Sequence, residues 1–168
     1  MTYDPSLMQR AIALSAQALT TPGTEPFAAL IVKDGKVVGE GFNHSVANFD
    51  PTSHGEIEAV RDACRKLATV NLSGCVIYTT CEPCALCVAA MHIAGIGQMY
   101  YAATLDQSGE AFEGVPTAAR HPIDVDKLRT EAGAPLRQRL PRAIQKMDAE
   151  AMMVLRAWAD QARVPIQD

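Results

Sequence analysis

Hydrophobic and polar residues recur along the chain with two different periods, so both helices and strands are expected. Apolar positions at helical spacing predict a first helix that begins at Asp4-Pro5. Its expected buried face comprises Leu7, Met8, Ala11, Ile12, Leu14 and Ala18. Two apolar runs, residues 27–32 and 37–41, then flank Asp34-Gly35. An Asp-Gly pair between apolar runs is typical of a β-hairpin.

The next part of the chain alternates between helix and strand. We expect a helix from His54 to about residue 67, a strand at 75–79, a helix at 84–94 and a strand at 98–102. The strand at 75–79 is nearly all apolar, which predicts a central strand that is covered on both faces. A hairpin followed by helix, strand, helix and strand requires crossover connections. The predicted fold class is therefore α/β, a three-layer α/β/α sandwich around a central mixed sheet.

The pattern weakens in the last third of the chain. Residues 109–121 are rich in Gly, Pro and Thr, which predicts an irregular loop. Residues 141–162 predict a final helix with Pro141 near its start. Its apolar stripe comprises Ile144, Met147, Ala151, Val154, Leu155 and Trp158. No repeat or linker interrupts the chain, so residues 1–168 are expected to form a single domain.

Composition and charge narrow the classes of protein that need to be considered. The net charge of −4 disfavours nucleic-acid binding, and no apolar run is long enough to predict a membrane span. A local basic cluster, Arg137, Arg139 and Arg142, is interpreted as a solvated face. The first 19 residues lack the features of a signal peptide, and three of five cysteines are clustered. These features predict a cytoplasmic protein whose cysteines bind a metal.

Three residues have the types and spacing expected of a catalytic zinc site. Cys84 and Cys87 lie three residues apart behind Pro83, so both thiolates can face one ion from the start of a helix. The helix dipole there favours their ionised forms. His54 can supply a third ligand, and three nitrogen or sulfur ligands leave one position open for water.

Glu56 and Cys81 each have two possible roles. A carboxylate beside the His54 ligand is suited to moving protons for a zinc-activated water. However, Ser53-x-x-Glu56 is also the pattern of a helix capping box. Cys81 is either uncoordinated or the fourth ligand of a closed structural zinc. An iron–sulfur cluster is disfavoured because Met91 occupies the position where a fourth cysteine would be required.

These motifs resemble those of the cytidine deaminase-like superfamily, and most closely those of bacterial guanine deaminases, over residues 26–112. The matching residues are Pro26-Phe27, Lys33-Asp34-Gly35, Gly41-x-Asn43, Asp50-Pro51-Thr52-x-His54-x-Glu56, Cys81-Glu82-Pro83-Cys84-x-x-Cys87 and Tyr101-Ala102-Ala103. The resemblance implies that zinc is bound by His54, Cys84 and Cys87, and that Glu56 carries protons during hydrolytic deamination. It also implies a homodimer that packs through the helices beside the metal.

The resemblance further implies a set of substrate-binding residues. The candidates are Asn43, Phe27, Ala28, Phe49 and Asp106. Asn43 is interpreted either as a contact to the base or as a cap of its own loop. The chain's single Trp lies in the last predicted helix, so stacking on a base falls to Phe27, Phe49, His92 or Phe112.

Several departures from the family pattern bear on the choice of substrate. Gly55 and Ala28 replace the more usual Ala and Gly, and Ile93 stands where guanine deaminases carry Trp. A free base of the guanine type is the first choice, and cytosine or cytidine is the alternative. A tRNA adenosine deaminase is less favoured because only Arg156 and Arg163 are basic in the last 20 residues.

Overall fold

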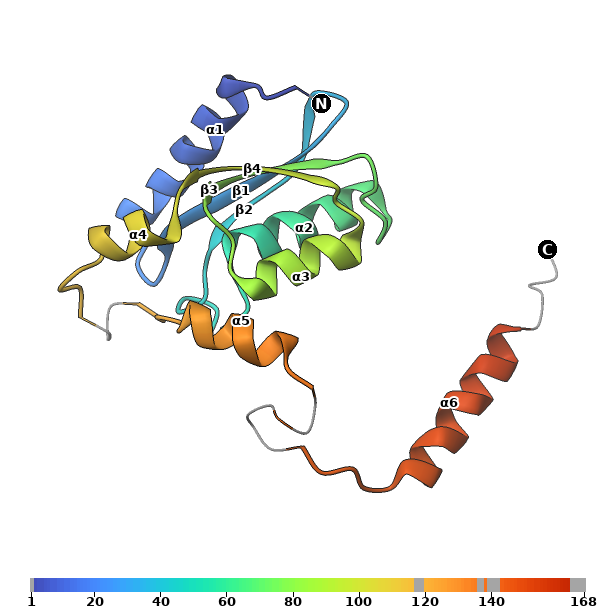
Figure 1. Cartoon of the computed structure of the whole chain (residues 1–168). Helices are drawn as coiled ribbons and strands as arrows, with labels where there is room; N and C mark the ends of the chain where they lie inside the picture. The colour runs from blue at the N-terminus through green and yellow to red at the C-terminus, as the bar shows by residue number, and fades with distance from the viewer. Residues whose placement is uncertain (1, 117–119, 136–137, 139–142, 164–168) are drawn as a thin grey trace. The chain divides into compact units, whose positions relative to one another are not determined.

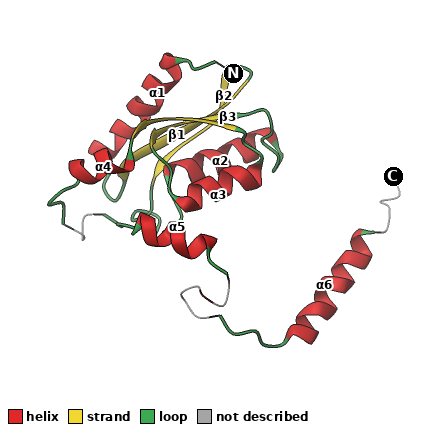
Figure 2. Cartoon of the chain, viewed as in Figure 1, coloured by secondary structure: helices red, strands yellow, loops and turns green. Residues whose placement is uncertain are grey.

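The computed structural model describes residues 2–116, 120–135, 138 and 143–163, which belong to two compact units, residues 1–130 and 131–168. Its elements are α1 (Pro5–Ser15), the 3₁₀ helix η1 (Ala16–Leu19), β1 (Glu25–Lys33), β2 (Lys36–Asn43), α2 (Gly55–Leu67), β3 (Val76–Cys81), α3 (Ala85–Ala94), β4 (Gln98–Ala103), α4 (Leu105–Ala111), α5 (Val125–Gly133) and α6 (Asp148–Ala162). Figure 2 shows these helices and strands along the chain. No helix of the described residues is long and apolar enough to cross a membrane.

The four strands form one mixed sheet in the order β2-β1-β3-β4. β1 is antiparallel to both β2 and β3, whereas β3 and β4 are parallel and are connected through α3. Asp34 and Gly35 both have positive φ angles, 49° and 75°, as a two-residue hairpin turn requires. The predicted hairpin, the central position of β3 and the mixed sheet are therefore confirmed.

Helices cover both faces of this sheet (Figure 1). Alternate residues of a strand point to opposite faces, so neighbouring residues of β1 enter different cores. Leu30 and Val32 pack with Leu7 and Met8 of α1, whereas Ile31 belongs to the core that α2 and α3 complete. The predicted three-layer α/β/α sandwich is confirmed.

Two glycines of β2 allow α2 to approach the sheet closely. A Cβ atom at Gly39 would lie 2.5 Å from the carbonyl oxygen of Ala59, and one at Gly41 would lie 2.5 Å from the Cβ of Glu58. Both distances are shorter than real Cβ contacts. The two glycines thus determine how close α2 lies to the sheet, and with it the position of residues at the start of this helix.

The largest differences from the prediction lie at the C-terminal end. The final helix begins at Asp148, not at residue 141, because Met147 adopts a left-handed conformation with φ 58° and residues 143–146 are not helical. Its apolar stripe was expected to be buried, yet Trp158 is 70% exposed. Met147, Val154 and Leu155 of this stripe are also exposed. Pro141 and the arginines of the basic cluster lie outside the described residues.

Two smaller predictions also need correction. Ile12 was expected on the buried face of α1 but is half exposed. The predicted loop at 109–121 begins within α4, which a capping box at Thr104 and Gln107 starts. The capping residues precede the segment that was interpreted as irregular, and this local signal could have been recognised in the sequence.

Candidate active site

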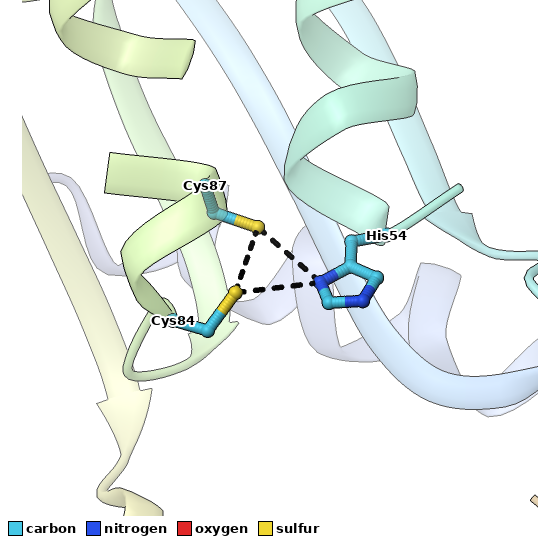
Figure 3. A group of neighbouring side chains, drawn as sticks. All are labelled: His54, Cys84 and Cys87. Carbon is cyan, nitrogen blue, oxygen red and sulfur yellow. Dashed lines mark hydrogen bonds between the residues drawn. The ribbon is translucent and has the colours of Figure 1, made fainter. Parts of the chain in front are cut away.

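Two helix N-termini bring the predicted metal ligands together. His54 is the N-cap residue of α2, and Cys84 is the N-cap residue of α3, with Cys87 in the first turn behind it. Figure 3 shows the Nδ1 atom of His54 facing both sulfur atoms. His54 and Glu56 were expected to converge at a helix tip, and the start of α2 is such a tip. Helix N-termini also favour anionic thiolates.

The ligand atoms are spaced as a tetrahedral zinc site requires. His54 Nδ1 lies 3.6 Å from Cys84 Sγ and 3.4 Å from Cys87 Sγ, and the two sulfur atoms are 3.7 Å apart. Tetrahedral zinc with ordinary bond lengths separates two sulfurs by about 3.8 Å and a sulfur from a nitrogen by about 3.5 Å. These three residues, called the metal site below, therefore fit zinc without rearrangement.

The protonation of the metal site also suits a divalent cation. A hydrogen bond from the Cys87 thiol, reinforced by His54, lowers the pKa of Cys84 to about 4. The same Cys84–Cys87 contact, followed by burial, raises the pKa of Cys87. Cys84 is thus the thiol that ionises more readily, and binding of a metal favours the ionised form of both thiols.

Glu56 lies directly beside the metal site, in the first turn of α2. Its Oε2 atom is 3.4 Å from Cys87 Sγ, and its Oε1 atom is 3.3 Å from Thr79 Oγ1 of β3. The side chain is almost completely buried. Burial raises the pKa of this carboxyl group, which favours a group that accepts and returns a proton.

The structure distinguishes between the two possible roles of Glu56. The N-cap residue of α2 is His54, not Ser53, and it makes no side-chain capping bond. The Ser53 hydroxyl instead donates to Glu58 Oε1 at 2.9 Å. The capping-box interpretation of Glu56 is therefore wrong. Cys81 Sγ faces the carbonyl oxygen of Thr104 at 3.8 Å and does not belong to the metal site.

Gly55, between the ligand and the carboxylate, is required by close packing. A Cβ atom at this position would lie 2.5 Å from the carbonyl oxygen of Phe27 and 3.0 Å from the Cα of Ala28. We expected glycine to free the backbone here, but its φ angle is not in the left-handed region. The missing side chain instead allows the start of α2 to contact β1.

The metal site opens into a cavity of about 260 Å³. The lining residues come from the sheet, from the starts of α2 and α3, from α4 and from the segment that leads into α5. They are Glu25, Phe27, Asn43, His54, Glu56, Cys81, Glu82, Cys84, Leu105, Ser108, Gly109, Phe112, Arg120, His121, Pro122, Ile123 and Val125. Most of this wall is apolar, with a few polar groups that converge on the space, as is usual for small-molecule sites. The cavity is the place where a substrate would meet the metal and Glu56.

Two of the predicted substrate-binding residues line this cavity. Phe27 is there, and its ring contacts Phe112 edge to face at 5.6 Å between centroids. Asn43 is also there, and its Oδ1 accepts the N–H of Ser45 at 2.9 Å. Asn43 thus caps its own loop while its side chain borders the cavity. Its role toward a substrate stays a prediction.

The other three candidates are not brought to the cavity. Ala28 is buried in β1, where its N–H donates to Thr80 Oγ1 at 2.9 Å. Phe49 is 95% exposed at a positive φ angle, and Asp106 is exposed in the first turn of α4. Ile93 is likewise 87% exposed. Three of the five predicted substrate-binding residues therefore lie outside the cavity wall, as does Ile93.

Several charged residues of the cavity wall were not anticipated. Glu25 and Arg120 form a largely buried ion pair at 3.3 Å, and Glu82 Oε2 accepts the N–H of Leu105 at 3.3 Å. Glu82 lies inside the cysteine motif and could have been considered. Arg120 belongs to no sequence motif that would have identified it. It lies beside Glu25 only because of the path that the chain takes after α4.

An α/β fold that holds three zinc ligands and a buried carboxylate at the wall of a cavity defines the site of a hydrolytic zinc enzyme. The chain belongs to the cytidine and deoxycytidylate deaminase family: the model of that family's zinc-binding region matches residues 1–103. It is a zinc-dependent deaminase, and the metal site supplies the ligands for the ion.

Known members of the family differ in what they act on. The guanine deaminase of Bacillus subtilis (strain 168) is 38% identical over 106 residues, which cover 63% of this chain and 68% of that protein. The crystal structure of Bacillus subtilis guanine deaminase matches with a TM-score of 0.81 at 30% identity, covering 98% of this chain and 99% of its own.

Two further relatives show the breadth of the family. A tRNA-specific adenosine deaminase of Aquifex aeolicus (strain VF5) is 38% identical over 81 residues, 48% of this chain and 54% of that protein. The crystal structure of a variant of NE0047 in complex with 8-azaguanine has a TM-score of 0.60 at 28% identity, covering 71% of this chain and 67% of its own.

Proposed function

We propose that this deaminase acts on a free nucleobase or a related aminated heterocycle, with guanine as the first choice. The observation that carries the proposal is the cavity at the metal site, whose volume of about 260 Å³ suits a base better than a nucleotide. Arg120 is the single lysine or arginine among its lining residues, and it is paired with Glu25. Similarity to a guanine deaminase and to a protein that binds 8-azaguanine supports the same choice.

Each residue of the site has its own role in the proposed hydrolytic deamination. Zinc in such a site makes water nucleophilic at neutral pH. Glu56 takes a proton from the attacking water and passes it to the ring nitrogen next to the attacked carbon. It then takes the remaining proton of the added hydroxyl group and delivers it to the departing amine. Phe27 forms an apolar wall for the ring, and Asn43 offers its amide to the edge of the base.

A panel of substrates tests this proposal directly. We expect ammonia release from guanine to exceed that from cytosine, adenine, triazine analogues and the corresponding nucleosides, since the cavity accommodates one planar ring system. Cytosine is the second choice. Faster deamination of nucleoside monophosphates than of every free base would contradict the proposal. Ammonia can be measured with a coupled assay under the same conditions for all compounds.

A role in tRNA editing is disfavoured. Long nucleic acids bind through clusters of basic residues, and α6 offers Arg156 alone, because Arg163 next to its end is paired with Asp160 at 2.7 Å. The net charge of −4 also disfavours binding to tRNA. A salt-dependent mobility shift on tRNA would contradict this exclusion.

We also propose that the protein is a homodimer, with α3 at the interface. This helix exposes Ile93 almost completely while its opposite face, which includes Met91, packs in the core. Ile93 lies on the same helix as the ligand Cys87, and in this proposal it packs against a second copy of the chain. We expect sedimentation at micromolar concentration to show a dimer, and Ile93→Lys to shift it toward monomer. A monomeric wild-type protein would contradict the proposal.

The remaining expectations concern domain organisation and location. We propose that residues 1–168 act as one deaminase domain in the cytoplasm. All five cysteines are free, which supports a reducing compartment. Unfolding should be followed separately in each of the two compact units. Coincident unfolding transitions would show that the two units form one cooperative domain.

A further inference from the structure

A buried ion pair in the cavity wall has no role in the chemistry described so far. Arg120 Nε lies 3.3 Å from Glu25 Oε2, and the side chains are 22% and 8% exposed, respectively. Both residues line the cavity that contains the metal site. Burying two charges is unfavourable unless their partners are well placed, so the presence of this pair beside the site calls for an explanation.

Two contacts hold the guanidinium of Arg120 in place, and a third orients its partner Glu25. It lies over the ring of Phe112, 4.3 Å from the centroid. Glu25 faces it, and Glu25 is itself oriented because its Oε1 accepts the N–H of His121 at 3.2 Å. Phe112 in turn contacts Phe27. The guanidinium is thus held against the cavity wall by charge and by an aromatic face, and the backbone N–H of His121 holds its partner Glu25.

The hydrogen-bonding capacity of Arg120 is largely unused. A guanidinium carries five N–H donors, but Nε is buried and has no hydrogen-bond partner, although Glu25 Oε2 lies 3.3 Å away as its ion-pair partner. Among the described residues, no acceptor forms a hydrogen bond with its terminal nitrogens. Unused donors at the wall of a cavity are suited to a ligand that presents acceptors.

We propose that Arg120 is a specificity-determining residue that donates hydrogen bonds to the oxo oxygen O6 and the ring nitrogen N7 of an oxopurine, with Glu25 as its positioning residue. This inference rests on the proposed function and names the edge of the base that is read. Arginine pairs in bidentate fashion with O6 and N7 of guanine because its planar fork matches these two acceptors. An adenine-type ring presents an amino donor at the same place and would oppose the guanidinium.

The charges around Arg120 favour a neutral acceptor over a phosphate. Glu25 already balances the charge of the guanidinium, and Glu82 adds a further carboxylate to the wall. A dianionic phosphate would meet net negative surroundings here. A neutral oxo group accepts the same N–H donors without that repulsion.

In guanine the O6–N7 edge and the 2-amino group lie on opposite sides of the ring. Arg120 and Glu56 would therefore contact opposite sides of one base.

Guanine and 2-aminopurine form a matched pair of probes for this contact. Both carry the 2-amino group that would be removed, but 2-aminopurine lacks the oxo oxygen. Arg120→Met keeps an unbranched apolar stem and removes every donor. We expect it to lower kcat/KM for guanine by about 5- to 150-fold, the discrimination that one bidentate pair provides, mostly through KM. The loss for 2-aminopurine should be smaller, because this base keeps the N7 acceptor but lacks the oxo oxygen.

Control variants separate recognition from folding. Arg120→Met leaves the buried Glu25 without its charged partner, which can unfold the protein. The double variant Glu25→Gln/Arg120→Met removes both charges and should show the same loss of preference for guanine. Glu25→Gln alone should raise KM for guanine by a smaller factor and leave kcat unchanged. Arg61→Met, on the exposed face of α2, should behave like the wild-type protein.

The outcomes that overturn the inference are distinct from those that overturn the proposed function. Equal losses on guanine and 2-aminopurine in the folded double variant would show a structural ion pair only. A selective loss on guanosine monophosphate would show a phosphate contact. If the wild-type protein deaminates no free base, the proposed function fails. Calorimetric binding of hypoxanthine against purine then still tests Arg120, and an unchanged ratio in Arg120→Met would overturn its role.

Discussion

Replacing Glu56 with glutamine is expected to lower kcat by about 10⁴-fold, at the upper end of what general acid–base catalysis contributes. The reason is that one carboxylate serves successive proton transfers, and no other acidic side chain of the described residues lies as close to the metal site. Glutamine has the same shape and retains the contact with Thr79, so fold and zinc content should be preserved. Steady-state turnover and metal analysis of one preparation provide the measurement.

The neighbouring variant Glu58→Gln is the matched control. Glu58 lies on the same helix, accepts the hydroxyl of Ser53 at 2.9 Å and pairs with Arg61 at 2.7 Å. Its substitution should therefore cost up to about 1 kcal/mol of stability with activity retained. A Glu56→Gln protein that still turns over at near the wild-type rate would show that the proton carrier is a different group.

Local patterns predicted the sandwich and the metal site because both depend on short-range chemistry. The hairpin follows from Asp34-Gly35, and the end of α3 follows from Gly95, which adopts the expected positive φ angle. Cys84 and Cys87 lie on one turn of a helix, so their spacing alone determines that they can bind one ion. His54 is 30 residues before Cys84, and it could be assigned to the same metal site only because the His-x-Glu motif is specific.

The cavity wall could not be predicted in the same way. Phe49 and Asp106 were selected from their places in or near motifs, yet they lie on the surface. Arg120 reaches the wall because the chain after α4 returns to the N-terminal end of β1, where Glu25 receives it. That contact joins residues 95 positions apart and depends on tertiary packing, which no periodicity encodes. The exposure of the apolar stripe of α6 was not predicted for a related reason. An amphipathic pattern indicates which face of a helix is apolar, but not which element packs against that face.

Exchange of Cys84 for serine is expected to remove both zinc and activity. Serine offers a hydroxyl that does not ionise near neutral pH, whereas the pKa of Cys84 is lowered to about 4 by Cys87 and His54, so the site loses its most readily formed thiolate. Structural zinc sites with sulfur ligands bind with apparent free energies of about 10–16 kcal/mol. Loss of one thiolate from a three-ligand site should therefore lower affinity enough for dialysis to empty it.

Cys81→Ser is the informative comparison, because Cys81 lies three residues before Cys84 and would be the fourth ligand of a closed site. Its sulfur faces the carbonyl oxygen of Thr104 at 3.8 Å, and a serine hydroxyl can still donate toward that oxygen. This variant should retain about one zinc per chain and most of its activity, measured by atomic absorption and ammonia release. Equal zinc loss in both variants would mean that four protein ligands close the coordination sphere. In that case no position would be left for water, and the open catalytic site inferred from His54, Cys84 and Cys87 would be wrong.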